Sequence, residues 1–167
     1  MSGLEDKVKP ETLFLLCAFP CTEGKMHRGE ITKEDFDSLE NAAKKGMVVD
    51  KKKLEEIYSF AVKEMALVAK ELGKPVWDNS VVEEYFFVRH NKVIDKREGP
   101  YAGAPEALCE YCKFYDAEVI KAGEKTLLVE YNNKKRNVLK DLVPDAKEGD
   151  KVKIHQSYAV IKINEKE

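Results

Sequence analysis

The sequence predicts an α+β protein in which an N-terminal helical domain precedes a small C-terminal β-barrel. Apolar residues recur at helical spacing in the first hundred residues and alternate with a period of two after residue 117. Between the two patterns, residues 98–105 contain two glycines and two prolines, which can continue neither a helix nor a central strand. We therefore expect a helical domain at 1–98, a linker at 99–105 and a barrel at 106–167.

Four helical segments are expected in the first part. The first begins at Pro10 and ends at Pro20, and the second is capped by Thr32 with Asp35 and stops at Gly46. The third and clearest runs from about residue 50 to residue 72, where a glycine and a proline follow. Ser80 with Glu83 forms a capping-box pattern for the fourth helical segment. Residues 85–88 are rich in strand formers, so a strand is the alternative there.

Five short strands are expected in the last fifty residues, at about 117–121, 127–131, 134–139, 151–154 and 158–163. Asn132-Asn133 and Gln156-Ser157 are the expected tight turns, because asparagine tolerates positive φ. Because an open sheet would leave unpaired backbone groups on its edge strands, we expect the five strands to close into an OB-like barrel. The first and last strands would then lie side by side. The basic run 134–136 is expected to be a solvated edge.

Composition narrows the class of protein. The net charge of −2, with 36% charged residues, makes nucleic acid an unlikely partner by bulk charge. The most apolar stretch, 13–19, is too short to cross a bilayer and lacks the pattern of a secretory signal. We therefore expect a cytoplasmic protein with no membrane partner. Four cysteines in such a protein are expected to be thiols or metal ligands.

The cysteines form two sequence pairs, Cys17-x3-Cys21 and Cys109-x2-Cys112. The spacing of the second pair is usual in zinc sites and in redox dithiols, and all four thiolates could close a tetrahedral zinc site between the domains. Alternatively, Cys17 packs as a small hydrophobic residue.

The three histidines carry weaker signals. His155 stands at the end of an expected strand, where an exposed histidine is the alternative to a metal ligand. His27 is expected in a loop, either solvated or bound to metal with Cys21, and His90 is assigned no role.

The C-terminal third resembles the HypC/HupF family of hydrogenase assembly chaperones. The shared features, in order and spacing, are Leu142-Val143-Pro144, Gly149-Asp150, Val152, Ile154, His155 and Ala159. Cys112, five residues before Ala117, stands where that family has its cysteine. In the family this cysteine follows the initiator methionine, whereas Cys112 is internal.

The resemblance implies a HypC-like barrel and a non-enzymatic accessory role in [NiFe]-hydrogenase maturation. Cys112 would hold, transiently, an iron carrying cyanide and carbonyl ligands, together with a HypD-like protein, for delivery to the hydrogenase large-subunit precursor. His155 would lie close to Cys112 as a second ligand or hydrogen-bond donor, and the helical domain would be an added docking surface. Two alternatives stay open: a zinc-stabilised module that binds protein or RNA, and a thiol redox protein using Cys109 and Cys112.

Overall fold

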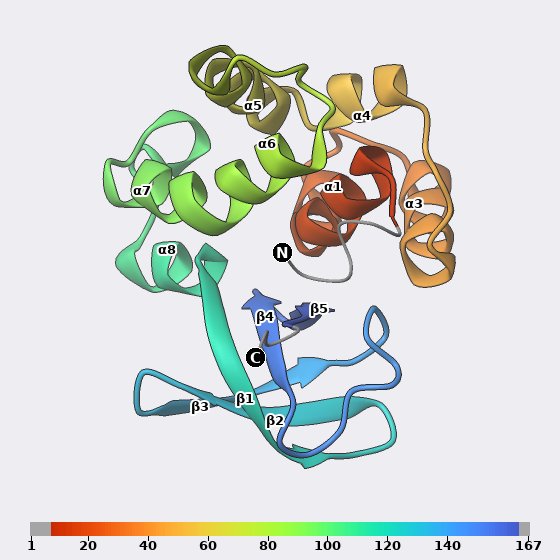
Figure 1. Ribbon diagram of the computed structural model, residues 1–167, viewed down its shortest axis with the longest axis vertical. Coiled ribbons are helices and arrows are strands. Elements are labelled where there is room, and N and C mark those ends of the chain that lie inside the picture. The colour runs from red at the N-terminus through yellow and green to blue at the C-terminus, as the bar shows by residue number, and fades with distance from the viewer. Residues whose placement is uncertain (1–7, 164–167) are drawn as a thin grey trace.

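The computed structural model describes residues 8–163 and shows helices stacked over a ring of five strands. The helices occupy the upper part of Figure 1 and the strands the lower part, and the view turned by 90° keeps the two parts in the same order. The predicted α+β class, with helices first and strands last, is therefore confirmed.

The chain begins with α1 (Pro10–Ala18), a 3₁₀ turn η1 (Phe19–Cys21) and α2 (Thr22–His27). Residues 12–18 of α1 are all buried, so this helix lies at the centre of the helical part. The predicted end of the first helix at Pro20 is confirmed to within two residues, because α1 stops at Ala18, but the predicted loop 21–27 is wrong. Proline is tolerated in the first turn of a helix, and Pro20 stands there in η1, so the chain tightens and continues as α2.

The second predicted helix is confirmed as α3 (Lys33–Lys45). The Thr32 side chain accepts a hydrogen bond from the backbone of Asp35, and the Asp35 carboxylate accepts one from the Thr32 backbone. Gly46 ends the helix in the left-handed conformation at φ 66°.

The long helix expected at 50–72 is instead two helices, α4 (Lys51–Ile57) and α5 (Ser59–Leu72). They meet at Tyr58, whose backbone leaves helical geometry at φ −112° and ψ 47°. The Tyr58 ring is buried edge-on against Phe14, and its hydroxyl lies 2.6 Å from the buried hydroxyl of Thr22. Tertiary packing and one buried hydrogen bond thus override a continuous helical pattern.

The fourth predicted segment is helical, and its strand alternative is wrong. It consists of α6 (Asn79–Glu84), a π-helical turn η2 (Tyr85–Arg89) and α7 (His90–Asp95). The N-cap of α6 is Asp78, whose side chain accepts a hydrogen bond from the Ser80 backbone at 2.9 Å. The expected cap, Ser80 with Glu83, is therefore wrong. A short 3₁₀ turn η3 (Gly99–Tyr101) then leads to α8 (Glu106–Cys112).

The strands are β1 (Phe114–Ala122), β2 (Thr126–Tyr131), β3 (Lys134–Leu139), β4 (Lys151–His155) and β5 (Tyr158–Lys162). Their order around the closed ring is β1-β2-β3-β5-β4, with antiparallel pairing except for a short parallel contact between β3 and β5. β1 therefore pairs with β4, and the expectation that the first and last strands are neighbours is wrong. The predicted turns are confirmed, because Asn132, Asn133 and Gln156 all have positive φ.

Two large clusters of buried apolar residues hold the molecule together. One fills the strand ring and includes Val119, Leu127 and Val152. The other lies among the helices but also takes in Phe114 and Val160 from the strands. The lower surface of the helical core is thus made by the strand ring.

The basic run 134–136 is only partly a solvated edge. Lys134 and Lys135 are exposed, but Arg136 stacks on the Tyr131 ring at 4.9 Å and donates to the Gln156 carbonyl at 3.0 Å. None of the helices within residues 8–163 is long and apolar enough to span a membrane.

Candidate thiol–imidazole site at the junction of helices and strands

The strand pairing brings two of the predicted site residues to the same end of the ring. His155 is the last residue of β4, and its backbone partner is Phe114, the first residue of β1. Cys112 ends α8, two residues before Phe114. Cys21 ends η1 and reaches the same place from the helical side. The site therefore lies where helices and strands meet.

The His155 ring is held in one orientation. Its Nδ1 lies 2.8 Å from the Cys17 carbonyl oxygen, so Nδ1–H donates there and Nε2 carries the free lone pair. Nε2 lies 3.5 Å from the Cys21 sulfur. The ring also stacks on Phe114 with centroids 4.3 Å apart. The arrangement provides a neutral imidazole whose unprotonated nitrogen faces a thiol.

Burial keeps this imidazole neutral. His155 is fully buried, and its pKa lies well below the ordinary value, first because of desolvation and then because His90 is close. A neutral imidazole is the form that accepts a proton from a thiol or binds a metal ion.

Gln156 connects the two thiols of the junction. Its side-chain Nε2 donates to the Cys21 sulfur at 3.3 Å and to the Cys112 sulfur at 3.4 Å. Arg136 fixes the turn by donating to the Gln156 carbonyl, while the neighbouring Ser157 hydroxyl contacts the Tyr111 hydroxyl. Cys21 and Cys112 thus share one amide donor although they are far apart in the sequence.

Both thiols are protonated at neutral pH. The pKa of Cys21 is raised to about 12, first by burial and then by the nearby Cys112. Burial also raises the pKa of Cys112, against the opposite effect of the Gln156 hydrogen bond. A metal ion or an attacking electrophile must therefore displace a proton from the thiol that it meets.

The other two cysteines lie in different surroundings. Cys17 is fully buried inside the helical core, where burial raises its thiol pKa, and it offers the site only its carbonyl oxygen. Cys109 is fully buried in a small cluster with Ile94. Within residues 8–163, no group of three or more His, Cys, Asp or Glu side chains is placed to hold a metal ion, so the four thiols do not form one cage.

Of the remaining histidines, His27 is solvated as one of its two alternatives predicted, although it lies on a helix, and His90 differs from expectation. His27 is exposed on α2 and lies 3.3 Å from the Glu23 carboxylate, away from Cys21's contacts. His90, which was assigned no role, is buried with its ring centroid 5.3 Å from that of His155. Its Nδ1 has no hydrogen-bond partner in the described chain, and burial lowers its pKa to about 4. The aromatic run 85–87 beside it was the one signal of burial in the sequence.

Asn91 and Gln156 are site residues that sequence reasoning missed. The Asn91 side chain donates to the Phe114 carbonyl and accepts from the Phe114 amide, both at 2.8 Å. It extends the hydrogen bonding of β1 to α7 and so fixes the strand end beside His155. An isolated amide side chain carries no pattern that would mark such a role in a sequence.

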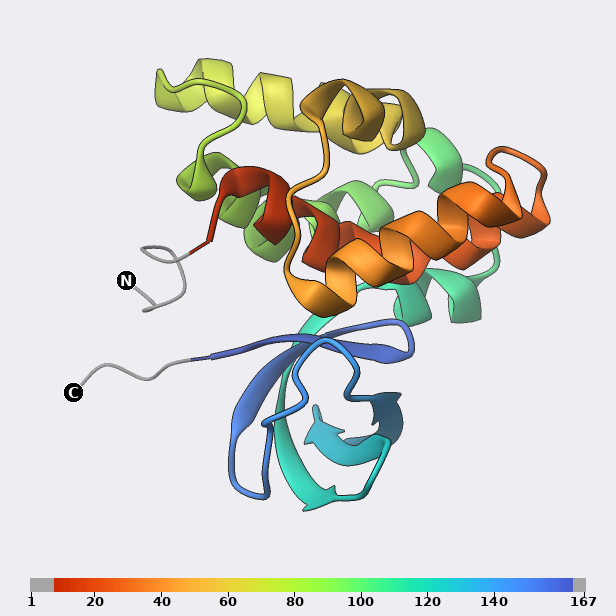
Figure 2. The same cartoon turned by 90° about the vertical axis from the view of Figure 1, so that its right-hand side faces the viewer.

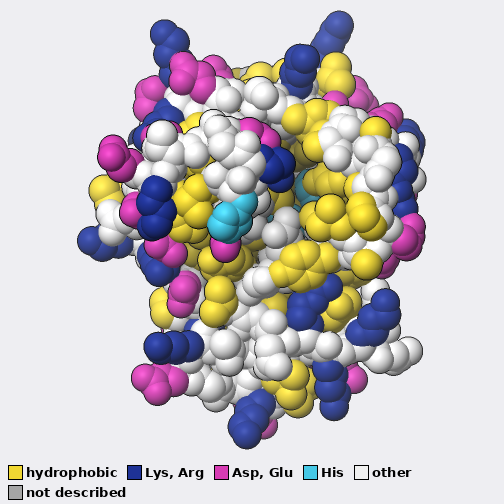
Figure 3. Space-filling model, turned by 180° about the vertical axis from the view of Figure 1, so that it is seen from behind, with side chains coloured by type: hydrophobic (Ala, Val, Ile, Leu, Met, Phe, Trp, Pro, Cys, Tyr) yellow, Lys and Arg dark blue, Asp and Glu magenta, His cyan; other side chains and the backbone are white. Residues whose placement is uncertain are grey.

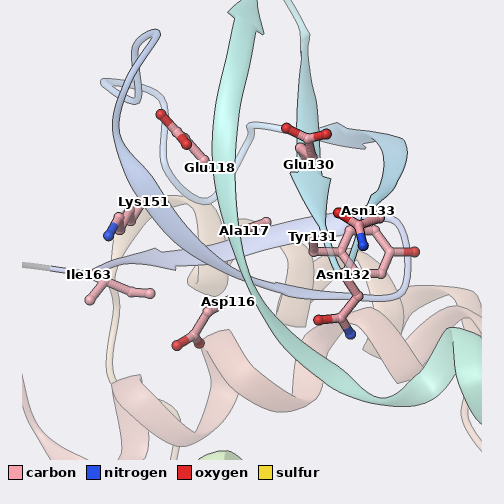
Figure 4. Close-up of a pocket in the computed structure, with 9 residues that line it drawn as sticks. All are labelled: Asp116, Ala117, Glu118, Glu130, Tyr131, Asn132, Asn133, Lys151 and Ile163. Atoms are coloured by element: carbon pink, nitrogen blue, oxygen red, sulfur yellow. The ribbon is translucent and has the colours of Figure 1, made fainter.

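A hollow lies elsewhere on the ring and is lined mainly by residues of β1 and β2. Figure 4 shows its lining, which includes Asp116, Glu118, Glu130 and Lys151, with the side chains spread around a broad opening. None of the predicted site residues lines it. On the back of the molecule, apolar side chains gather at mid-height, between the helical part and the ring, and charged side chains stand mostly around them (Figure 3).

A scan of protein-family models and a search of curated proteins found no match to this chain.

Proposed function

We propose that this protein is a non-enzymatic accessory factor in assembly of the [NiFe]-hydrogenase iron centre. One observation carries the proposal: Cys112 and His155, the two residues that the HypC/HupF resemblance singles out, come to the same end of the strand ring. The backbone pairing of Phe114 with His155 brings them there, and Gln156, next to His155, bonds the Cys112 sulfur.

The strand ring supports the same assignment. A five-stranded ring in the order β1-β2-β3-β5-β4, with β3 and β5 parallel, is the arrangement of an OB-like barrel. We propose that residues 106–163 form a HypC-like unit of this kind, in which α8 leads into the barrel. The Leu142-Val143-Pro144 and Gly149-Asp150 segments then belong to the connection between β3 and β4.

The donor chemistry fits an iron cargo. A thiolate from Cys112 and a neutral imidazole from His155 form a soft and borderline donor pair that suits iron. An iron already carrying cyanide and carbonyl ligands has few open positions, so one or two protein ligands are enough. Cys112 would be the iron ligand and partner contact, and His155 a second ligand or a hydrogen-bonding support.

Burial of the site implies that a partner opens it. Only 6% of Cys112 is exposed, and the half-buried Gln156 side chain bonds its sulfur. We propose that docking of a HypD-like protein displaces Gln156 and frees the thiol in the cytoplasm. The helices over the ring would add a docking surface, and the hydrogenase large-subunit precursor would receive the iron.

Co-purification with the cognate HypD tests the proposal. Cys112→Ala should abolish the complex, while Cys109→Ala, three residues earlier in the same helix, should retain it. Equal loss from both would favour a shared dithiol or zinc site instead. Metal content of protein purified without added metal separates the alternatives further, since stoichiometric zinc would support a zinc-stabilised module.

A further inference from the structure

The thiols that meet in the fold are not the ones that are neighbours in the sequence. Cys21 and Cys112 bond the same Gln156 nitrogen at 3.3 and 3.4 Å. Their sulfurs are therefore at most about 7 Å apart, the sum of those two distances. Because Gln156 is half-buried on a turn, its side chain can swing out from between them.

A buried imidazole contacts one thiol of this pair. Nε2 of His155 lies 3.5 Å from the Cys21 sulfur, and its Nδ1 is held by the Cys17 carbonyl. The Cys21 thiol therefore donates to a fixed acceptor, which holds its sulfur beside Gln156. Cys17 and Cys109, by contrast, are fully buried among apolar side chains.

We propose that Cys21 and Cys112 form a reversible disulfide that ties the helical part to the strand ring. The oxidant is a small disulfide such as oxidised glutathione. Cys21 loses its proton to solvent and attacks one sulfur of the oxidant, which releases one small thiolate that takes up a proton. Cys112 then attacks the Cys21 sulfur of the mixed disulfide, and the Cys112 proton goes to the second small thiolate as it leaves. In total, one small disulfide is reduced to two small thiols, and one Cys21–Cys112 bond forms.

The bond would have a functional consequence. It would remove the Cys112 thiol from metal binding and would cross-link η1 to the end of α8. The regulatory meaning rests on the proposed function, but the formation of the bond does not.

Disulfide mapping of the full chain tests the inference without any partner protein. Reduced protein is incubated with oxidised glutathione, free thiols are alkylated, and peptides are mapped without reduction. Cleavage after Glu110 separates Cys109 from Cys112. We expect a bridge from the Cys112 peptide to the peptide that carries Cys21, reversed by dithiothreitol. A Cys109–Cys112 bridge would overturn the inference.

Two matched double variants identify the partners. C17A/C109A keeps only the junction thiols and should lose both free thiols on oxidation. C21A/C112A keeps only the buried thiols and should retain both while folded. The inference fails if C17A/C109A keeps its free thiols, or if the wild-type bridge involves Cys17. Wild-type mapping by tandem mass spectrometry gives the same decision where a variant does not fold. Protein that forms the bridge on oxidation but does not bind HypD when reduced would count against the proposed function alone.

Discussion

The interior of the strand ring and the junction above it are both buried, yet they are built from different chemistry. The interior is apolar throughout the cluster that contains Leu127, Val129 and Ile154. The junction buries the imidazoles of His90 and His155, whose ring centroids are 5.3 Å apart, and the Cys112 thiol. Nδ1 of His90 has no hydrogen-bond partner among the described residues. Burial of polar groups costs stability unless they are paired. The ring interior thus stabilises the fold, and the junction uses part of that stability to hold reactive groups.

The largest expected effect comes from breaking the ring interior. Leu127→Ala removes a fully buried side chain and should lower the free energy of unfolding by about 3 kcal/mol. Urea denaturation measures the loss. Leu108→Ala, at a leucine that is 47% exposed, is the matched control and should change stability by less than about 0.5 kcal/mol. Equal losses would mean that the interior of the ring is not the stabilising core.

The junction should make the protein sensitive to acid. His90 titrates near 6.5 when unfolded but has a pKa of about 4 when folded, so the unfolded state binds more protons between these values. Stability is therefore full above pH 6.5 and falls as the pH drops to 4, by on the order of 3 kcal/mol from His90 alone. His155 acts in the same direction.

Substitution can isolate this contribution. His90→Phe keeps a ring in the aromatic pocket beside Phe114 and removes the ionisable group, so the free energy of unfolding should depend less on pH. His27→Gln, at an exposed histidine, serves as the matched control for the loss of one histidine. If the free energy of unfolding of His90→Phe falls between pH 6.5 and pH 4 as steeply as that of the wild type, the acid sensitivity does not come from the junction.

The connection between the two regions should be weaker but measurable. Asn91→Ala removes two hydrogen bonds to the Phe114 backbone and should destabilise the protein by about 2 kcal/mol. Hydrogen exchange of the Phe114 amide should become faster at the same time. Asn137→Ala, at an exposed asparagine on β3, is the control and should do neither. An unchanged Phe114 exchange rate would show that α7 does not fix the start of β1.

The smallest effect concerns reactivity and not stability. Gln156→Leu keeps the bulk of the side chain but removes the N–H donor that lowers the pKa of Cys112. Alkylation of Cys112 by iodoacetamide at fixed pH should slow by roughly threefold to tenfold. Ser157→Ala, on the same turn, leaves that donor in place and serves as the control. Faster alkylation in Gln156→Leu would mean that Gln156 acts by shielding the thiol.

Local patterns predicted the strand ring better than the helices. Alternation and turn residues such as Asn132 and Gln156 determine strands and hairpins over short distances, and these predictions were confirmed. The break at Tyr58 was missed because it depends on Thr22, thirty-six positions away. The pairing of Cys21 with Cys112 was missed for the same reason. Sequence spacing grouped the cysteines along the chain, whereas the fold groups them across the junction.

The proposed function depends most on Cys112 and His155, which would hold the iron cargo. Infrared spectroscopy of the complex purified with the cognate HypD measures this directly, because iron-bound cyanide and carbonyl give characteristic stretching bands. The bands should be present in wild type and in Cys109→Ala, shifted or weakened in His155→Ala, and absent in Cys112→Ala. Bands of full intensity and unchanged position in Cys112→Ala, or no bands in the wild-type complex, would contradict the account.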